Sequence, residues 1–173
     1  MAKKITKLSG FSEVSGRIQN LITTEIFETE FSPVSLQDLK DATVNNGWAY
    51  NWAEFADAFR IVKINTINNP KIVHGLVAFT VDKDYIFMDF IENAPFNRGA
   101  NKIYSSVAGN LIAFLCHLSQ QLGFNGYVVF KSKPQLVDYY ISQYDATKHP
   151  QQKDILYISP ENAQRFINRY LNF

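Results

Sequence analysis

The fold of this chain is decided by one stretch, residues 85–123, which reads YIFMDFIENAPFNRGANKIYSSVAGNLIAFLCHLSQQLG. Residues 85–92 predict a strand, and residues 93–102 form a polar loop that contains Pro95, Arg98 and Gly99. From 103 to 122 the apolar residues recur every three or four positions, which predicts one long amphipathic helix that ends at Gly123. The apolar positions are Ile103, Val107, Leu111, Phe114, Leu115, Leu118 and Leu122.

Two further strands precede this stretch. Residues 59–64 predict the first strand and residues 72–81 the second, and a turn at 68–70 connects them. Residues 81–84 are typical of a short hairpin connection to the strand at 85–92. The pattern therefore predicts a meander of three antiparallel strands.

The N-terminal part is less regular. Residues 13–31 are compatible with a strand pair or with a helix. Ser35 precedes Leu36, Gln37 and Asp38, which is typical of a helix N-cap with an acid in the first turn, and we expect this helix to stop near 45–47. Residues 48–59 are aromatic and indicate a helix or a structured loop.

On the C-terminal side the pattern alternates between strand and helix. Residues 127–130 predict a short buried strand, 134–144 a helix, and 155–158 another strand. Pro160 opens a last helix with Ser159 as its cap. Antiparallel strands that pass into a β-α-β crossover form an α/β sheet of mixed direction.

This order of elements resembles the GNAT family of N-acyltransferases over residues 59–158. The family motif Gln/Arg-x-x-Gly-x-Gly/Ala-x-x-Leu falls here on residues 103–111, where Ala108 and Leu111 match it, while Ile103 and Ser106 replace the first two motif residues. The chain also resembles an uncharacterised bacterial GNAT-like subgroup, whose Lys-x-x-Leu-x-x-x-Tyr helix matches 133–140. The resemblance implies one α/β (α+β) domain, 1–173, with a GNAT-like mixed, largely antiparallel sheet and helices on both faces.

By this resemblance the acyl donor is an acyl-CoA, most simply acetyl-CoA. The start of the long helix would hold its pyrophosphate on backbone amides, because a helix N-terminus attracts anions and small residues let phosphates approach. The alternative is that the small residues only allow the helix to pack closely on the sheet. The residues that the resemblance assigns to the cofactor are Arg98, Lys102, Ser106, Val107, Ala108, Gly109 and Asn110.

Acyl transfer from a thioester to an amine needs a base for the amine and an acid for the leaving thiolate. GNAT enzymes often carry the base on the strand before the motif, and Glu92 ends the corresponding strand here, with Asp89 three residues earlier on the opposite face. Tyr140, on the later helix, is the expected acid, and Tyr139 lies beside it in sequence. The alternatives are an anchoring carboxylate and a core tyrosine.

The resemblance implies an amine as the acceptor. The first 92 residues carry 12 acidic against 9 basic side chains, which suggests that this amine is cationic. By resemblance its site would be formed partly by the N-terminal helices, where an aromatic run could line it. The alternative is that these rings pack the helices onto the sheet. The run consists of Trp48, Tyr50, Trp52 and Phe55, and Glu54 and Asp57 lie among them.

Composition excludes several other classes of protein. The net charge of +1 argues against a nucleic-acid partner, and no apolar run approaches a bilayer span. One cysteine, Cys116, allows no intrachain disulfide, and the segment 1–8 has no apolar core of a signal peptide, so we expect a cytoplasmic protein without a membrane partner. The histidines and Cys116 lack metal-ligand spacing, so no metal is expected. A homodimer is compatible with this picture.

Two functions from different classes remain at this point. The small-residue turn, Glu92 and Tyr140 favour an acyl-CoA-dependent N-acyltransferase. The missing motif glycine and Ile103 favour a catalytically inactive GNAT-fold module that binds a ligand or another protein. Fold by itself decides neither.

Overall fold

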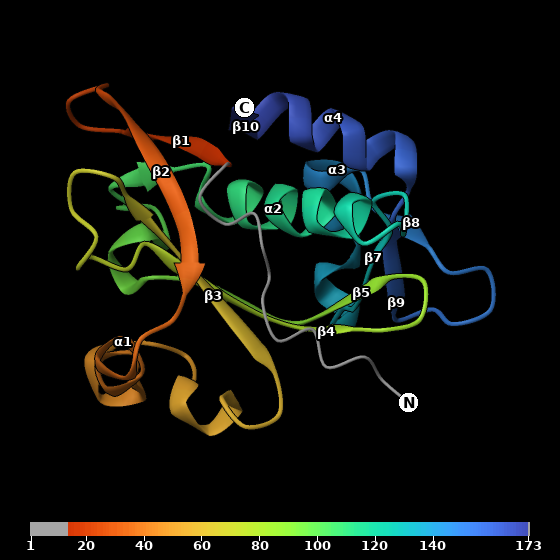
Figure 1. Cartoon of the computed structure of the whole chain (residues 1–173), viewed down its shortest axis with the longest axis horizontal. Coiled ribbons are helices and arrows are strands. Elements are labelled where there is room, and N and C mark those ends of the chain that lie inside the picture. Colours follow the sequence, from red (N-terminus) through yellow and green to blue (C-terminus); the bar gives the residue numbers. More distant parts are fainter. Residues whose placement is uncertain (1–13, 173) are drawn as a thin grey trace.

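The computed structural model describes residues 14–172. They form one sheet of ten strands in the order β10-β1-β2-β3-β4-β5-β7-β9-β8, with β6 paired to β1 (Figure 1). The strands are β1 (Ser15–Asn20), β2 (Ile26–Pro33), β3 (Arg60–Thr66), β4 (Gly75–Val81), β5 (Ile86–Asn93), β6 (Tyr104–Ser105), β7 (Val128–Lys131), β8 (Thr147–Lys148), β9 (Ile155–Ile158) and β10 (Leu171–Asn172). Two parts of the expected domain 1–173 lie outside the described residues: residues 1–13, which include the segment 1–8, and residue 173.

Within residues 14–172, four α-helices and four single-turn 3-10 helices accompany the sheet. The α-helices are α1 (Leu36–Asp41), α2 (Val107–Gln121), α3 (Val137–Tyr144) and α4 (Pro160–Tyr170), and the 3-10 helices of the described chain are η2 (Val44–Asn46), η3 (Trp52–Phe55), η4 (Pro95–Asn97) and η5 (Pro134–Leu136). Within residues 14–172, no helix has the length and apolar character that a membrane span requires.

The sheet has mixed direction, as the sequence predicts. β3, β4 and β5 pair antiparallel as a meander, and β7 pairs parallel to β5 after the crossover through α2. The stretch that the sequence left open is a strand pair, because β1 and β2 form an antiparallel hairpin from Ser15 to Glu30. The mixed, largely antiparallel sheet confirms the predicted fold class.

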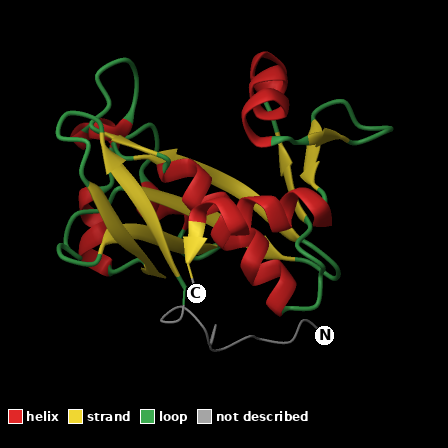
Figure 2. Cartoon of the chain, turned by 90° about the horizontal axis from the view of Figure 1, so that it is seen from above, coloured by secondary structure: helices red, strands yellow, loops and turns green. Residues whose placement is uncertain are grey.

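Helices and loops cover both faces of this sheet (Figure 2). Val77 and Phe79 of β4 belong to the core beneath α2, while Leu76 and Ala78 belong to a second core that contains Trp52. Neighbouring residues of one strand point to opposite faces, so this alternation places one core on each side. The long helix α2 lies on one face, and α1 and the aromatic segment after it lie on the other.

Local capping signals set two of the helix starts. Ser35 caps α1 through a capping box, in which its hydroxyl accepts from the Asp38 amide at 3.0 Å and the Asp38 carboxylate accepts from the Ser35 amide at 2.9 Å. Ser159 caps α4 in the same position, with its hydroxyl accepting from the Asn162 amide. Both caps confirm the prediction from sequence.

The start of α2 differs from the prediction. The helix expected from residue 103 begins at Val107, because Tyr104 and Ser105 pair with β1 as strand β6. Ser106 then adopts a left-handed backbone with φ of 70°, which turns the chain from the strand into the helix. Tertiary pairing with a distant strand thus overrides the helical periodicity of the first four residues.

Candidate functional site

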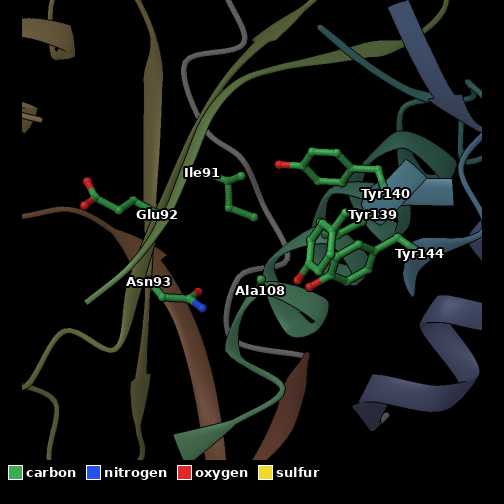
Figure 3. Close-up of a pocket in the computed structure, with 8 residues that line it drawn as sticks. Ile91, Glu92, Asn93, Ala108, Tyr139, Tyr140 and Tyr144 are labelled. Atoms are coloured by element: carbon green, nitrogen blue, oxygen red, sulfur yellow. The ribbon is translucent and has the colours of Figure 1, made fainter. Parts of the chain in front are cut away.

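A cleft opens where β5 and β7 separate. The two strands pair only from Ile86 to Met88 of β5, and β5 then continues to Asn93 without this neighbour. The space in the cleft is about 130 Å³, which suits the end of a ligand better than a whole one, since ligand pockets usually measure roughly 300–1,000 Å³. The residues that line the cleft, shown in Figure 3, are Ile91, Glu92, Asn93, Ala108, Ile112, Tyr139, Tyr140 and Tyr144.

The N-terminus of α2 borders this cleft. Its first backbone hydrogen bond runs from the Asn110 amide to the Ser106 carbonyl, and the Ser106 side chain caps nothing. No residue within 14–172 accepts a hydrogen bond from the amides of Val107, Ala108 or Gly109. Unpaired amides at the positive end of a helix dipole are the usual means of holding a phosphate. Ala108 is half-buried and lines the cleft, so it brings this end of the helix to the site.

Two of the small or polar residues at this helix start have packing partners. A Cβ built on Gly109 would lie 2.5 Å from the ring of Tyr170 on α4, so the missing side chain is needed for the contact between α2 and α4. The Asn110 side chain exchanges hydrogen bonds with the backbone of Arg17 at 2.9 and 3.1 Å, which ties β1 to α2. Close packing therefore explains Gly109 and the side chain of Asn110.

The two predicted cationic ligands differ in their surroundings. The Arg98 guanidinium donates to the Glu92 carboxylate at 3.0 Å and to the Gly47 carbonyl, so it joins the loop after β5 to the N-terminal part of the chain. Lys102 is exposed in the same loop. Of the two predicted charges, the one on Arg98 already has an acidic partner.

Glu92 belongs to the lining of the cleft, but its buried side chain leaves β5 toward the opposite face of the sheet. Its carboxylate accepts hydrogen bonds from the Trp52 indole at 2.8 Å, from the Ala49 amide at 2.5 Å, and from Arg98. Figure 3 shows its side chain leaving the strand away from the tyrosines, whereas its neighbours Ile91 and Asn93 point toward them. The structure therefore does not bring the carboxylate of Glu92 together with the phenol of Tyr140, and the assignment as base stays a prediction.

Tyr140 presents its hydroxyl to the cleft. Its ring contacts Phe130 edge-on with centroids 4.9 Å apart, and its hydroxyl is directed toward Ile91 (Figure 3). Burial raises the pKa of the Tyr140 phenol, and the nearby Tyr139 and Tyr50 add to this shift. A phenol with a raised pKa keeps its proton at neutral pH, so Tyr140 has a proton to donate, although it is a weaker acid than an exposed phenol.

Tyr139 and Tyr144 form the rest of the tyrosine wall. Their hydroxyls lie on the Ala108 side of the cleft in Figure 3, and their rings meet edge-on with centroids 5.9 Å apart. Burial is the main cause that raises the pKa of Tyr144. Three adjacent phenols make this wall polar but uncharged.

The aromatic run near the N-terminus packs against the other face of the sheet. Trp52 is fully buried, and Phe55 stacks on Phe90 of β5 with ring centroids 4.2 Å apart. Tyr50 contacts Trp52, Phe55 and Phe90 edge-on. These contacts are the packing alternative that the sequence left open.

Within residues 14–172, no group of three or more His, Cys, Asp or Glu side chains is arranged to hold a metal ion.

Comparison with solved structures identifies the architecture. A mutant of the AtaT toxin, bound to the C-terminus of the antitoxin AtaR and to acetyl-CoA, matches with a TM-score of 0.53 at 6% identity, over 81% of this chain and 98% of that one. The ribosomal-protein-S18-alanine N-acetyltransferase of Escherichia coli matches with a TM-score of 0.51 at 12% identity, over 75% and 90%. The chain has the GNAT fold.

A third GNAT-fold structure, an acetyltransferase of the GNAT family from Listeria monocytogenes, gives a TM-score of 0.51 at 8% identity, over 84% of this chain and 95% of that one. No protein-family model and no curated protein matches the chain by sequence. The likeness is therefore one of GNAT architecture, and it confirms the resemblance drawn from residues 59–158 at the level of the fold.

Three polar residues of this cleft were not proposed as site residues from the sequence. Asn93 shares a face with Ile91, two residues earlier, so strand alternation could have found it. Tyr144 follows Tyr140 by four residues and therefore shares its helix face, which the sequence showed only as an apolar spacing. Tyr139 precedes Tyr140, and only the tertiary structure shows that it also lines the cleft.

Proposed function

We propose that this chain transfers an acyl group, most simply acetyl, from an acyl-CoA to an amine. The observation that carries the proposal is the cleft beside the part of β5 that no longer pairs with β7, because this cleft meets the N-terminal amides of α2, which have no acceptor within residues 14–172. The GNAT-fold neighbours support it, since one was solved with acetyl-CoA and another is an N-acetyltransferase. The acyl-CoA would supply an activated thioester.

The residues present fit an acyl-CoA at this place. The amides of Val107, Ala108 and Gly109 would hold the pyrophosphate, because they lack acceptors within residues 14–172. The apolar side chains of Ile91 and Ile112 would contact the methylene groups of the pantetheine arm. The exposed Lys102 would add a cation, whereas Arg98 could do so only by leaving Glu92.

Tyr140 would act as the acid in this reaction. The amine nitrogen attacks the thioester carbonyl, the C–S bond breaks, and the phenol of Tyr140 gives its proton to the leaving sulfur. Glu92 is the proposed base. Because its carboxylate lies on the opposite face of β5, the amine proton would have to reach it through water or after the Arg98 contact opens.

The alternative function is a GNAT-fold binding module without catalysis. It is favoured by the position of the Glu92 side chain, which points away from the tyrosines and is held by three donors. Among the described residues that line the cleft, no other carboxylate is present. The same fold and the same acyl-CoA binding site are compatible with it. If acetyl-CoA binds, turnover separates the two proposals.

Calorimetric binding of acetyl-CoA to the purified protein tests both proposals. We expect binding by the native chain and a loss of at least about tenfold in Ala108→Glu, because the new carboxylate repels the pyrophosphate. Ala108→Gln is the matched control, since it adds the same bulk without the charge and should lose less. Both variants should stay folded, because Ala108 is only half-buried. In Ala108→Glu, the new acid also lies in the first turn of a helix, where a negative charge is favourable.

Release of free thiol from acetyl-CoA, measured with a panel of primary amines, then distinguishes the enzyme from the module. Amine-dependent release that falls in Tyr140→Phe supports the transferase. Binding without any amine-dependent release supports the module. A native protein that fails to bind acetyl-CoA contradicts the transferase and leaves the GNAT-fold module, as one that binds another protein, as the better account.

A further inference from the structure

The side chain of Asn93 has an unused hydrogen-bonding group at the cleft. Asn93 is the last residue of β5, and its carbonyl oxygen Oδ1 is buried without a donor among the described residues. Figure 3 shows its amide directed toward Ala108, at the N-terminal end of α2. A buried acceptor without a donor costs free energy, so a native structure that keeps one calls for an explanation.

Other buried asparagines near this site have their amides in use. Asn97 donates to the ring and the carbonyl of His74 and accepts from the Tyr104 amide at 3.2 Å. Asn110 donates to and accepts from the backbone of Arg17. Each of them ties two segments of the chain together. Asn93 makes no such tie within residues 14–172, and it faces a cleft.

We propose that the side-chain amide of Asn93 binds a secondary amide of the pantetheine arm of CoA. This inference rests on the proposed function, since it assigns a partner to the donor site of that reaction. A side-chain amide carries one acceptor and two donors, and rotation about its last torsion exchanges their positions. It can therefore accept from the ligand N–H and donate to the ligand C=O, which neither a carboxylate nor an aliphatic side chain can do.

The surroundings of Asn93 suit this ligand better than a charged amine. Ile91 and Ile112 provide apolar contact on the same side of β5, and the tyrosine hydroxyls add uncharged polar groups. The nearest carboxylate in sequence, Glu92, points to the other face and is already bound by three donors. A neutral amide linked to methylene groups matches a wall of this kind.

The test compares two ligands in calorimetry: CoA, and adenosine 3′,5′-bisphosphate, which carries the nucleotide part without the pantetheine. We expect Asn93→Leu, which keeps the size but removes both polar atoms, to weaken CoA binding about tenfold and to leave the affinity for adenosine 3′,5′-bisphosphate unchanged. Asn101→Leu, the same change at an exposed loop position, is the matched control and should alter neither affinity.

A second readout separates ligand binding from a structural role. Because Asn93→Leu removes a buried acceptor that has no donor within residues 14–172, it should not lower the midpoint of thermal unfolding of the free protein. A structural asparagine would lower that midpoint when replaced. The expected combination is therefore weaker CoA binding at undiminished stability.

The remaining outcomes are distinguishable. Native protein that binds CoA while Asn93→Leu binds it equally well overturns the inference and leaves the proposed function standing. An equal loss for both ligands also overturns it, because the change would then act on the whole site. Unchanged CoA binding with a raised KM for an amine assigns Asn93 to the acceptor and overturns it too. Native protein that binds no CoA overturns the inference together with the proposed function.

Discussion

At the scale of single residues, Glu92 organises the junction between β5 and the N-terminal half of the chain. The donors that it accepts from lie 43, 40 and 6 residues away in sequence. Its side chain is only 4% exposed, and that of Arg98 is 37% exposed. Loss of the carboxylate therefore leaves the buried indole of Trp52, the partly buried amide of Ala49 and one partly solvated cation without their acceptor.

We expect Glu92→Gln to lower the free energy of unfolding by about 1–3 kcal/mol, because the new amide places a donor against existing donors. Urea unfolding at neutral pH measures this change. Arg98→Gln is the comparison and should lose less, since Arg98 is partly solvated and exposed ion pairs contribute little. A Glu92→Gln protein of native stability with abolished turnover would instead favour the role of base.

The buried imidazole of His74 should make the free energy of unfolding depend on pH. Burial lowers the pKa of this imidazole to about 4, whereas the unfolded chain keeps an ordinary value near 6.5. Between these values the unfolded chain binds more protons, so stability falls as pH drops from about 6.5 to about 4, by up to about 3 kcal/mol, and is unaffected above that window.

Urea unfolding of the native protein and of His74→Gln, at several pH values from 4 to 7, measures this contribution. The variant should be less sensitive to pH in that range, because it has no group to protonate. An identical pH dependence of the two proteins would assign the acid sensitivity to other groups.

At the scale of elements, the first turn of α2 has two tasks that require different residues. Ala108 borders the cleft, while Gly109 lies directly under Tyr170 of α4. The pattern of small residues that resembles a phosphate-binding turn is therefore also the surface on which α4 packs. Sequence alone does not separate these two uses, because both need small side chains.

We expect Gly109→Ala to lower the free energy of unfolding by about 1–3 kcal/mol, because the added methyl overlaps the ring of Tyr170. The cost should shrink in a Tyr170→Ala background, where the ring is absent. A double-mutant cycle by urea unfolding measures this coupling. Equal costs in the two backgrounds would contradict the packing explanation.

At the scale of the whole molecule, the core beneath α2 shields Cys116. The thiol is fully buried, and burial raises its pKa well above the ordinary range. We expect this thiol to react with a disulfide reagent only through unfolding or large opening, so the native protein should react many times more slowly than protein in denaturant. Absorbance of the released thiolate follows both reactions, and immediate labelling of the native protein would contradict this packing.

Much of the fold could be predicted because it is encoded locally. The capping serines at 35 and 159, the apolar period of α2 and the short turn before Tyr85 act within a few residues, and the structure contains each of them. The boundary of α2 was wrong by four residues because Tyr104 and Ser105 pair with a strand more than 80 residues away. Periodicity carries no information about such a partner.

The sequence by itself determined the order of elements, the mixed direction of the sheet and the resemblance to the GNAT fold, because these follow from periodicity, caps and connections along the chain. Only the tertiary structure decided that the carboxylate of Glu92 belongs to the core side with Trp52, while Asn93 and three tyrosines share the cleft. The physical reason is that a strand exposes neighbouring residues to opposite faces, and long-range packing alone assigns each face its partners.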